Sequence, residues 1–332
     1  MNLLLKDILN MAEIRFAQEG CLTPRLDAEL LFCHVLGRDK SWLFLHYGDE
    51  LTDKTCEEYF RLVDMRAEGT PLQYITGSQE FMGLPFLVNK KVLIPRQDTE
   101  LLVEKALAIL LDRKMPKGGF QILDLCCGSG AIAVSLAHHL KEAKKKAMIT
   151  ASDISRSALG VAKANAQINR VEKQIRFVEG DLFAAFRKSR KGRGKLQFDM
   201  IVSNPPYIPT EVLPTLMREV RDHEPMMALD GGPDGVDFYI KILAEAYLHL
   251  AKDGALLLEI GYDQGPVLTL LAEAAGAYGP AEIVKDLSGN DRLVLLQPKT
   301  TTGTDPVGTK TTTGTDPVGA KTTTGTDPVG AK

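Results

Sequence analysis

Apolar residues in the first 75 positions recur at helical spacing, and no β-rich run interrupts them. One set fits a helix that stops near Gly20: Leu4, Ile8, Met11, Ile14 and Ala17. A second helix is predicted for residues 24–36, a short one capped by Ser41, and another for residues 53–68. The pattern therefore predicts a small helical domain over residues 1–74.

The pattern changes between residues 75 and 92, where Gly77, Gly83 and Pro85 punctuate apolar and aromatic positions. Such punctuation is typical of a β-hairpin, and we interpret this stretch as an interdomain linker.

Short apolar runs alternate with helical patterns from residue 121 onward. Seven runs are strand candidates: 121–126, 148–153, 175–179, 200–203, 255–260, 281–285 and 293–297. Because helices lie between most of them, we expect a largely parallel sheet covered on both faces. The last two runs have no helix between them, which indicates an antiparallel hairpin at the end of the sheet. We assign residues 93–298 to this second domain.

Residues 299–332 contain an eleven-residue sequence three times, each copy with one proline, two glycines and a single large apolar residue: Val307, Val318 and Val329. So little apolar surface cannot offset the entropy of ordering, and we expect a disordered tail.

Composition excludes several classes of protein. The 332 residues are 44% hydrophobic and carry a net charge of −3, which gives no electrostatic case for stable nucleic-acid binding. No signal peptide and no apolar stretch long enough to span a bilayer is recognisable, so we expect a cytoplasmic protein without a membrane partner. The five cysteines form no CxxC pair, so neither a disulfide framework nor a metal site is expected. We expect a monomer.

Residues 122–134 read as a strand, a tight glycine turn and a helix. Glycines at such a turn let the backbone approach a ligand at the start of a helix. A nucleotide-dependent dehydrogenase could use a similar turn, so this motif alone does not identify the ligand. The candidate cofactor-binding residues here are Asp124, Cys126, Cys127, Gly128, Ser129 and Gly130.

Acidic side chains follow the next two predicted strands. Asp153 ends one of them, about 23 positions after Gly130, where an acid can hold both hydroxyls of a ribose. The other ends in Glu179-Gly-Asp181-Leu-Phe183, which suits contacts to the edge and face of an adenine. The alternative is that Asp153 and Asp181 only cap the following helices.

Asn204-Pro205-Pro206-Tyr207 follows the fourth predicted strand of the sheet. Consecutive prolines stiffen the backbone and leave carbonyls free to accept hydrogen bonds. The Asn204 side-chain oxygen and the Pro205 carbonyl can together hold the two hydrogens of an NH2 group, while Tyr207 offers a flat face for a planar amide or a base. Such acceptors stabilise the positive charge that appears on a nitrogen as it takes a methyl group.

Over nearly the whole of residues 1–298 the chain resembles the protein-(glutamine-N5) methyltransferases of peptide chain release factors, the PrmC/HemK family. The resemblance rests on the Asn-Pro-Pro-Tyr motif and on further matching blocks: Pro71–Gly77, Leu93–Glu100, Glu224–Gly235, Leu258–Gly261 and Asp286–Arg292. Two departures stand in the cofactor loop, where Cys126 replaces the usual first glycine and Cys127 a Thr or small residue. A Cβ at position 126 would crowd the cofactor if that position needs a positive φ. Leu182 stands where some members have an aromatic residue.

This resemblance implies an α/β fold, a Rossmann-like class I S-adenosylmethionine methyltransferase preceded by a helical domain that helps to hold the release factor. It implies S-adenosyl-L-methionine as cofactor, with its loop at residues 126–130, Asp153 at the ribose and Leu182 near the adenine. Asn204 to Tyr207 would bind the target, the glutamine of a Gly-Gly-Gln motif in class I release factors. Asn204 is also a candidate cofactor-binding residue.

Two alternatives remain at this stage. The same motif fits the exocyclic amine of adenine, so an adenine-N6 methyltransferase acting on nucleic acid is one, although the chain lacks a separate basic recognition domain. A non-catalytic module that binds S-adenosylmethionine is the other.

Overall fold

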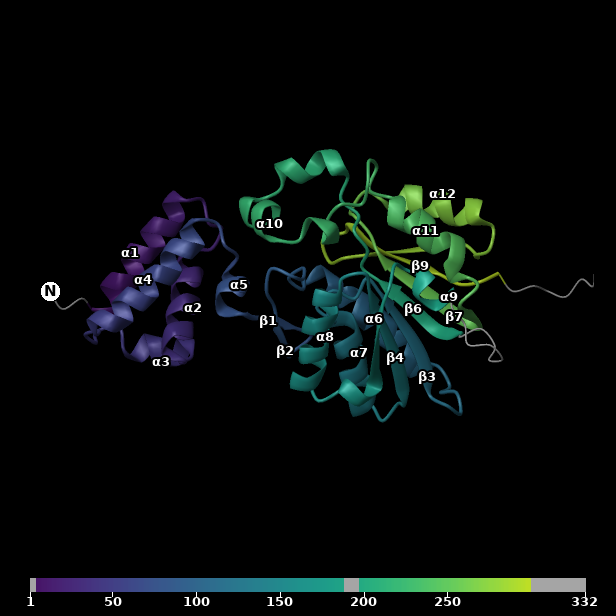
Figure 1. Ribbon diagram of the computed structural model, residues 1–332, viewed down its shortest axis with the longest axis horizontal. Coiled ribbons are helices and arrows are strands. Elements are labelled where there is room, and N and C mark those ends of the chain that lie inside the picture. The colour runs from purple at the N-terminus through teal and green to yellow at the C-terminus, as the bar shows by residue number, and fades with distance from the viewer. Residues whose placement is uncertain (1–3, 188–196, 300–332) are drawn as a thin grey trace, which may run out of the picture. The chain divides into compact units, whose positions relative to one another are not determined.

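The computed structural model describes residues 4–187 and 197–299 (Figure 1). The expectation of a disordered repeat tail therefore concerns residues outside the described ranges, except Lys299. None of the helices in the described ranges is both long and apolar enough to cross a bilayer.

The N-terminal region is helical, as its apolar spacing predicts. Its helices are α1 Leu5–Gln18, α2 Pro24–Leu36, α3 Lys40–Leu45, α4 Asp53–Ala67 and α5 Leu72–Thr76. They enclose a hydrophobic core of their own, centred on Phe16, Phe32 and Tyr59. This core explains how the region is stabilised although its helices are short.

Two details of these helices differ from the sequence expectation. The buried face of α1 consists of Leu5, Ile8, Leu9, Ala12 and Phe16, whereas Met11 and Ile14 are exposed. The N-cap of α3 is Asp39, whose side chain accepts a hydrogen bond from the Trp42 backbone N–H, and not Ser41.

A two-stranded antiparallel hairpin follows, formed by β1 Ser78–Phe81 and β2 Leu84–Leu87. Phe81 and Phe86 are buried in the core between the central sheet, which follows in the chain, and the helices on one of its faces. The Asn165 side chain on α8 (Arg156–Ile168) accepts a hydrogen bond from the Leu87 N–H and donates one to the Leu87 carbonyl. The hairpin is thus fixed to the sheet domain. The domain boundaries drawn from the sequence remain a prediction.

The central sheet has the strand order β5-β4-β3-β6-β7-β9-β8. Its strands are β3 Phe120–Leu125, β4 Ala147–Asp153, β5 Ile175–Glu179, β6 Phe198–Ser203, β7 Leu250–Glu259, β8 Glu282–Lys285 and β9 Asp291–Leu296. The strands β3 to β7 are parallel to one another, while β9 is antiparallel to both β7 and β8. The expected C-terminal hairpin is therefore confirmed.

Helices cover both faces of this sheet (Figure 1). Alternate strand residues point to opposite faces, so Ile122 joins one core while Leu123 joins the other. The core on the Ile122 face includes α6 Asp98–Asp112, α7 Ala131–Glu142 and α8. The opposite core includes α11 Asp237–Ala246 and α12 Gly265–Ala275.

Shorter elements complete the fold. They are η1 Glu172–Gln174, α9 Ala184–Arg187, η2 Thr210–Thr215, α10 Arg218–His223 and η3 Met226–Ala228. The parallel strands β3, β4, β5 and β6 all end at one edge of the sheet, which is where open α/β sheets bind their ligands.

Candidate active site

The turn after β3 has the backbone of a ligand-binding loop. Cys126, Gly128 and Gly130 all have positive φ, at 58°, 53° and 79°. A Cβ on Gly130 would lie 3.0 Å from the Ala162 Cβ, so the glycine allows α7 and α8 to pack closely. A Cβ on Gly128 would meet nothing within 4 Å, which leaves open space above the loop for a ligand.

Cys126 does have the positive φ that its place in the loop raised as a question. It lies in the left-handed region that glycine tolerates and other residues rarely adopt. Burial raises the pKa of its thiol, and the nearby Asp153 carboxylate raises it further. Burial likewise raises the pKa of the Cys127 thiol. Both cysteines therefore stay neutral and are poor nucleophiles.

Asp124 lies beneath the loop and is fully buried. Its Oδ2 accepts a hydrogen bond from the Ala133 backbone N–H at 3.1 Å, in the first turn of α7. Its Oδ1 has no hydrogen-bond partner among residues 4–187 and 197–299. Burial raises the pKa of this carboxyl well above its usual value. An unpaired buried oxygen beside the loop is compatible with a donor on a bound cofactor.

Asp153 lies at the carboxyl end of β4 and faces the same loop. One carboxylate oxygen accepts a hydrogen bond from the Gly128 N–H and the other from the Ser155 N–H, both at 2.8 Å. Each oxygen has a further lone pair, so the fixed carboxylate can still accept from two ribose hydroxyls. The alternative that Asp153 caps α8 does not hold, because the N-cap is Ser155, whose own hydroxyl accepts a hydrogen bond from the Ala158 N–H.

The two residues expected near an adenine differ in their surroundings. Asp181 is exposed, whereas Leu182 is partly buried and packs against the core beneath α11. Leu182 also has a positive φ of 43°. The next residue, Phe183, is 1% exposed and stacks on His249 at 4.8 Å, so its ring is not available to an adenine.

The Asn-Pro-Pro-Tyr turn directly follows β6, the strand beside β3. Ser203 precedes the turn, and its hydroxyl donates to the Leu125 carbonyl at 2.8 Å, which ties the turn to the cofactor loop. Pro205 and Pro206 are buried, whereas Asn204 and Tyr207 are half-buried. None of the described residues donates a backbone hydrogen bond to the Pro205 carbonyl. The turn thus keeps acceptors at the sheet edge that holds Asp153.

Two later segments of the chain contact the Tyr207 backbone, one at Gly231 and one at Gln264, the N-cap of α12. The Gln264 side chain donates to the Tyr207 carbonyl at 3.1 Å. A Cβ on Gly231 would lie 2.7 Å from the Tyr207 Cα, so only glycine permits this backbone approach. Burial raises the pKa of the Tyr207 phenol, and Glu259 raises it further, so this hydroxyl stays protonated.

Two buried residues beside Asn204 were not assigned a role from the sequence. Thr99 is 5% exposed and accepts a hydrogen bond from Asn204 Nδ2 at 3.1 Å. Glu259 is 1% exposed and accepts one from the Tyr207 hydroxyl at 3.4 Å. The matching blocks Leu93–Glu100 and Leu258–Gly261 contain these residues and were the available signal.

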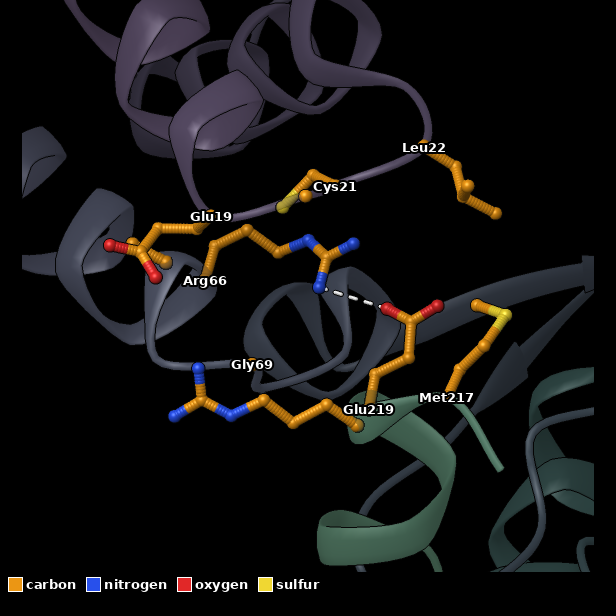
Figure 2. A pocket seen from close by; sticks show the side chains of 10 residues that line it. Glu19, Cys21, Leu22, Arg66, Gly69, Met217 and Glu219 are labelled. Carbon is orange, nitrogen blue, oxygen red and sulfur yellow. Dashed lines mark ion pairs between the residues drawn. The ribbon is translucent and has the colours of Figure 1, made fainter. Parts of the chain in front are cut away.

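A pocket of about 270 Å³ lies away from these groups, between the N-terminal helices and the start of α10 (Figure 2). Arg66 lines it and forms ion pairs with Asp27 at 2.7 Å and Glu219 at 2.9 Å. None of the predicted site residues lines this pocket. The ion pair with Glu219 joins the helical region to the segment that follows the Asn-Pro-Pro-Tyr turn.

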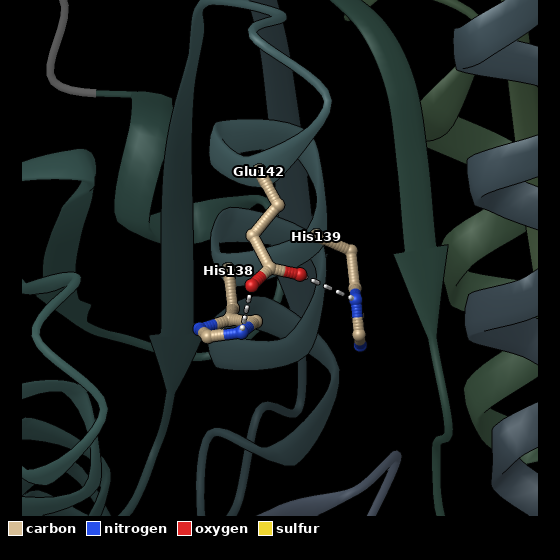
Figure 3. A group of neighbouring side chains, drawn as sticks. All are labelled: His138, His139 and Glu142. Carbon is tan, nitrogen blue, oxygen red and sulfur yellow. Dashed lines mark ion pairs between the residues drawn. The ribbon is translucent and has the colours of Figure 1, made fainter.

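Three potential metal ligands also lie together, at the end of α7 (Figure 3). Glu142 is 3.3 Å from His138 Nε2 and 3.7 Å from His139 Nδ1. No metal site was expected from the sequence, and these three residues were not among the candidates. They lie about 12–18 Å along the helix axis from Gly130 of the cofactor loop, at about 1.5 Å per residue, so they take no part in the candidate active site.

Comparison with known proteins agrees with this architecture. A model described as the PrmC N-terminal domain matches residues 7–77, and one described as the methyltransferase small domain matches residues 101–219. Among solved structures, the hMettl16 catalytic domain in complex with MAT2A 3'UTR hairpin 6 has a TM-score of 0.50 at 13% identity, covering 75% of this chain and 84% of that one. This likeness concerns the fold alone. The fold is that of a class I methyltransferase that uses S-adenosylmethionine.

Curated relatives specify the family. The release factor glutamine methyltransferase of Moorella thermoacetica is 43% identical over 291 residues, covering 88% of this chain and 97% of that protein. The protein of the same name from Clostridium acetobutylicum is 38% identical over 269 residues, covering 81% and 90%. The chain belongs to the family of release factor glutamine methyltransferases.

Proposed function

We propose that this protein transfers a methyl group from S-adenosylmethionine to the side-chain amide nitrogen of the glutamine in the Gly-Gly-Gln motif of class I release factors. The observation that carries the proposal is the orientation of Asn204, whose Nδ2 donates to Thr99 and whose oxygen is left for a ligand. The Pro205 carbonyl is a second acceptor in the same turn. The names of the relatives supply the release factor as substrate.

The chemistry requires acceptors of this kind. The lone pair of a carboxamide nitrogen is delocalised, so the nitrogen is a poor nucleophile and becomes positively charged as it takes the methyl group. Asn204 Oδ1 and the Pro205 carbonyl would accept the two N–H hydrogens and stabilise that charge more in the transition state than in the ground state. They would also orient the nitrogen toward the methyl group, with the amide plane against Tyr207.

The cofactor supplies an activated methyl group, and Asp153 and the open space at Gly128 fit it, whereas the Cβ of Cys126 would narrow the loop. Asp153 would hold the ribose hydroxyls, and the space above Gly128 would admit the ligand close to the backbone. Asp124, Cys126, Cys127, Ser129 and Gly130 would shape the loop, and Asp181 and Leu182 would border the adenine. We further propose that the protein acts in the cytoplasm, as a monomer.

The test separates transfer from cofactor binding. Asn204→Ala should lower kcat for release factor methylation on the order of 10²–10³-fold, because one positioned acceptor is lost, with S-adenosylmethionine affinity nearly unchanged by calorimetry. Asn10→Ala, a change at an exposed asparagine on α1, serves as the control and should leave kcat unchanged. An unaltered turnover in Asn204→Ala would show that the assigned role is wrong.

Asp153→Ala should have the opposite profile and weaken cofactor affinity by at least about tenfold, because a charge-assisted pair of hydrogen bonds is lost. Unchanged affinity would remove Asp153 from the ribose site. Methylation assays with DNA and rRNA in place of the release factor test the alternative of a nucleic-acid methyltransferase. Transfer of the methyl label to nucleic acid alone would support that alternative.

A further inference from the structure

A buried carboxylate lies directly behind the Asn-Pro-Pro-Tyr turn. Glu259 is the last residue of β7, the strand that pairs with β6, and Ser203 is opposite Leu258 in the register. Glu259 is therefore next to Asn204 across the sheet. At 1% exposure a carboxylate is costly unless it is hydrogen-bonded or has a function.

The contacts of Glu259 are few for so buried a group. Its Oε1 accepts from the Tyr207 hydroxyl at 3.4 Å. Its Oε2 has no hydrogen-bond partner within the described part of the chain. The Thr99 hydroxyl interacts with this carboxylate and favours its charged form. Thr99 is thus the donor available to complete the hydrogen bonding of Glu259.

Thr99 connects Glu259 to Asn204. A hydroxyl has one proton to donate and an oxygen that accepts. If that proton is committed to Glu259, the Thr99 oxygen can only accept, and Asn204 must then present its NH2 group to Thr99. This is the orientation that the structure has, with Nδ2 at 3.1 Å from Thr99 Oγ1. The Asn204 oxygen is then left for the target amide.

We propose that Glu259 is a positioning residue for methyl transfer, which acts through Thr99 to hold the Asn204 amide with its oxygen toward the substrate nitrogen. The inference rests on the proposed function. The reversed amide would point its NH2 group at the NH2 group of the target, and two donors cannot form a hydrogen bond.

The charge of Glu259 should control this arrangement. Burial raises the pKa of Glu259 to about 7; the Asp98 carboxylate raises it, while Thr99, Arg292 and Tyr207 lower it. Protonated Glu259 can itself donate to Thr99, which frees the Thr99 hydroxyl to donate to the Asn204 oxygen and reverses the amide. The charged form is therefore the competent one, and kcat should rise with pH through about 7.

Kinetics test the positioning role. Glu259→Gln and Thr99→Val should each lower kcat on the order of 10- to 100-fold at pH 8, with KM for the release factor and affinity for S-adenosylmethionine within about twofold. Thr99→Ser keeps the hydroxyl and should restore most of the rate. Glu282→Gln, a change at an exposed glutamate on β8, is the control. A kcat for Glu259→Gln within about threefold of wild type would overturn the proposal.

A second measurement does not depend on catalysis. In the wild-type protein the Asn204 side-chain NH2 resonances, assigned by their loss in Asn204→Ala, should shift with a midpoint near the pKa of Glu259, about 7. The shift should vanish in Glu259→Gln and Thr99→Val. The same titration in Glu259→Gln would refute the coupling. If the wild-type protein methylated no release factor, the proposed function would fail, while this titration would still decide the inference.

Discussion

The adjacent cysteines of the cofactor loop allow a stability test with an internal control. Cys126 has a φ of 58°, whereas Cys127 has no positive φ and is 7% exposed. A left-handed conformation costs a residue with a Cβ about 1–2 kcal/mol, and glycine costs about 0.5–1 kcal/mol in extra unfolded-state entropy. At position 126 the backbone strain of a residue with a Cβ outweighs the entropy cost of glycine. At position 127 only the entropy cost of glycine applies.

The glycine and alanine variants should therefore rank in opposite order at the two positions. Cys126→Gly should be about 1 kcal/mol more stable than Cys126→Ala, because only glycine relieves the strained backbone. Cys127→Gly should be about 1 kcal/mol less stable than Cys127→Ala. Comparing the two variants at one site cancels the loss of the sulfur, which both share.

The assay is equilibrium unfolding in urea, with the free energy of unfolding extrapolated to water for the four variants. Binding of S-adenosylmethionine by each variant shows that the loop still forms. The same rank order at both positions, with alanine the more stable, would refute the claim that the Cys126 backbone is strained.

Three further predictions concern the supports of the site. Arg66→Ala should lower the free energy of unfolding in urea by about 3–5 kcal/mol, because it leaves the buried Asp27 carboxylate without its ion pair. Glu219→Ala, at the partly exposed end of the same ion-pair network, should cost under about 1 kcal/mol. Equal losses in the two variants would contradict this. Gly231→Ala should lower kcat at least about tenfold, because its Cβ would lie 2.7 Å from the Tyr207 Cα. Calorimetry should find cofactor binding intact. A normal kcat would show that the close approach of the Gly231 and Tyr207 backbones is not required. The pKa of Glu259 rises on folding from 4.5 to about 7, so the free energy of unfolding should fall as pH rises through this window, by about 3 kcal/mol in all. Glu259→Gln should lack this dependence on pH. If the variant kept it, another group would be responsible.

The arrangement of the sheet domain could be predicted because buried parallel strands read as continuous apolar runs. Ile175–Glu179 was predicted to the residue, and the other strands lie within a few residues of their predicted ends, except that β7 begins at Leu250. The early start of β7 was missed because Lys252 and Asp253 interrupt its apolar run and are exposed.

Local apolar spacing was a poorer guide to the N-terminal helices. Met11 and Ile14 match helical spacing as well as Leu9 and Ala12 do, but tertiary packing decides which stripe is buried. The α5 helix was missed because five residues between Pro71 and Gly77 are too few for a periodic signal.

In the candidate site too, some residues could be predicted from the sequence and others could not. The cofactor loop, Asp153 and the Asn-Pro-Pro-Tyr turn are contiguous motifs at strand ends, and such motifs can be recognised from the sequence. Thr99 and Glu259 could not be assigned a role, because Thr99 meets Asn204 across 105 positions and Glu259 meets Tyr207 across 52. Only the pairing of β6 with β7 brings Glu259 beside Asn204.

In the proposed reaction Asn204 and Pro205 hold the target nitrogen with two oxygen acceptors. The most direct test is a crystal structure of the complex with a release factor and S-adenosylhomocysteine. We predict that the glutamine side-chain nitrogen lies within hydrogen-bond distance, about 3 Å, of both Asn204 Oδ1 and the Pro205 carbonyl oxygen, on the side that faces the sulfur. A glutamine bound away from residues 204–207, or facing the Asn204 NH2 group, would contradict the account.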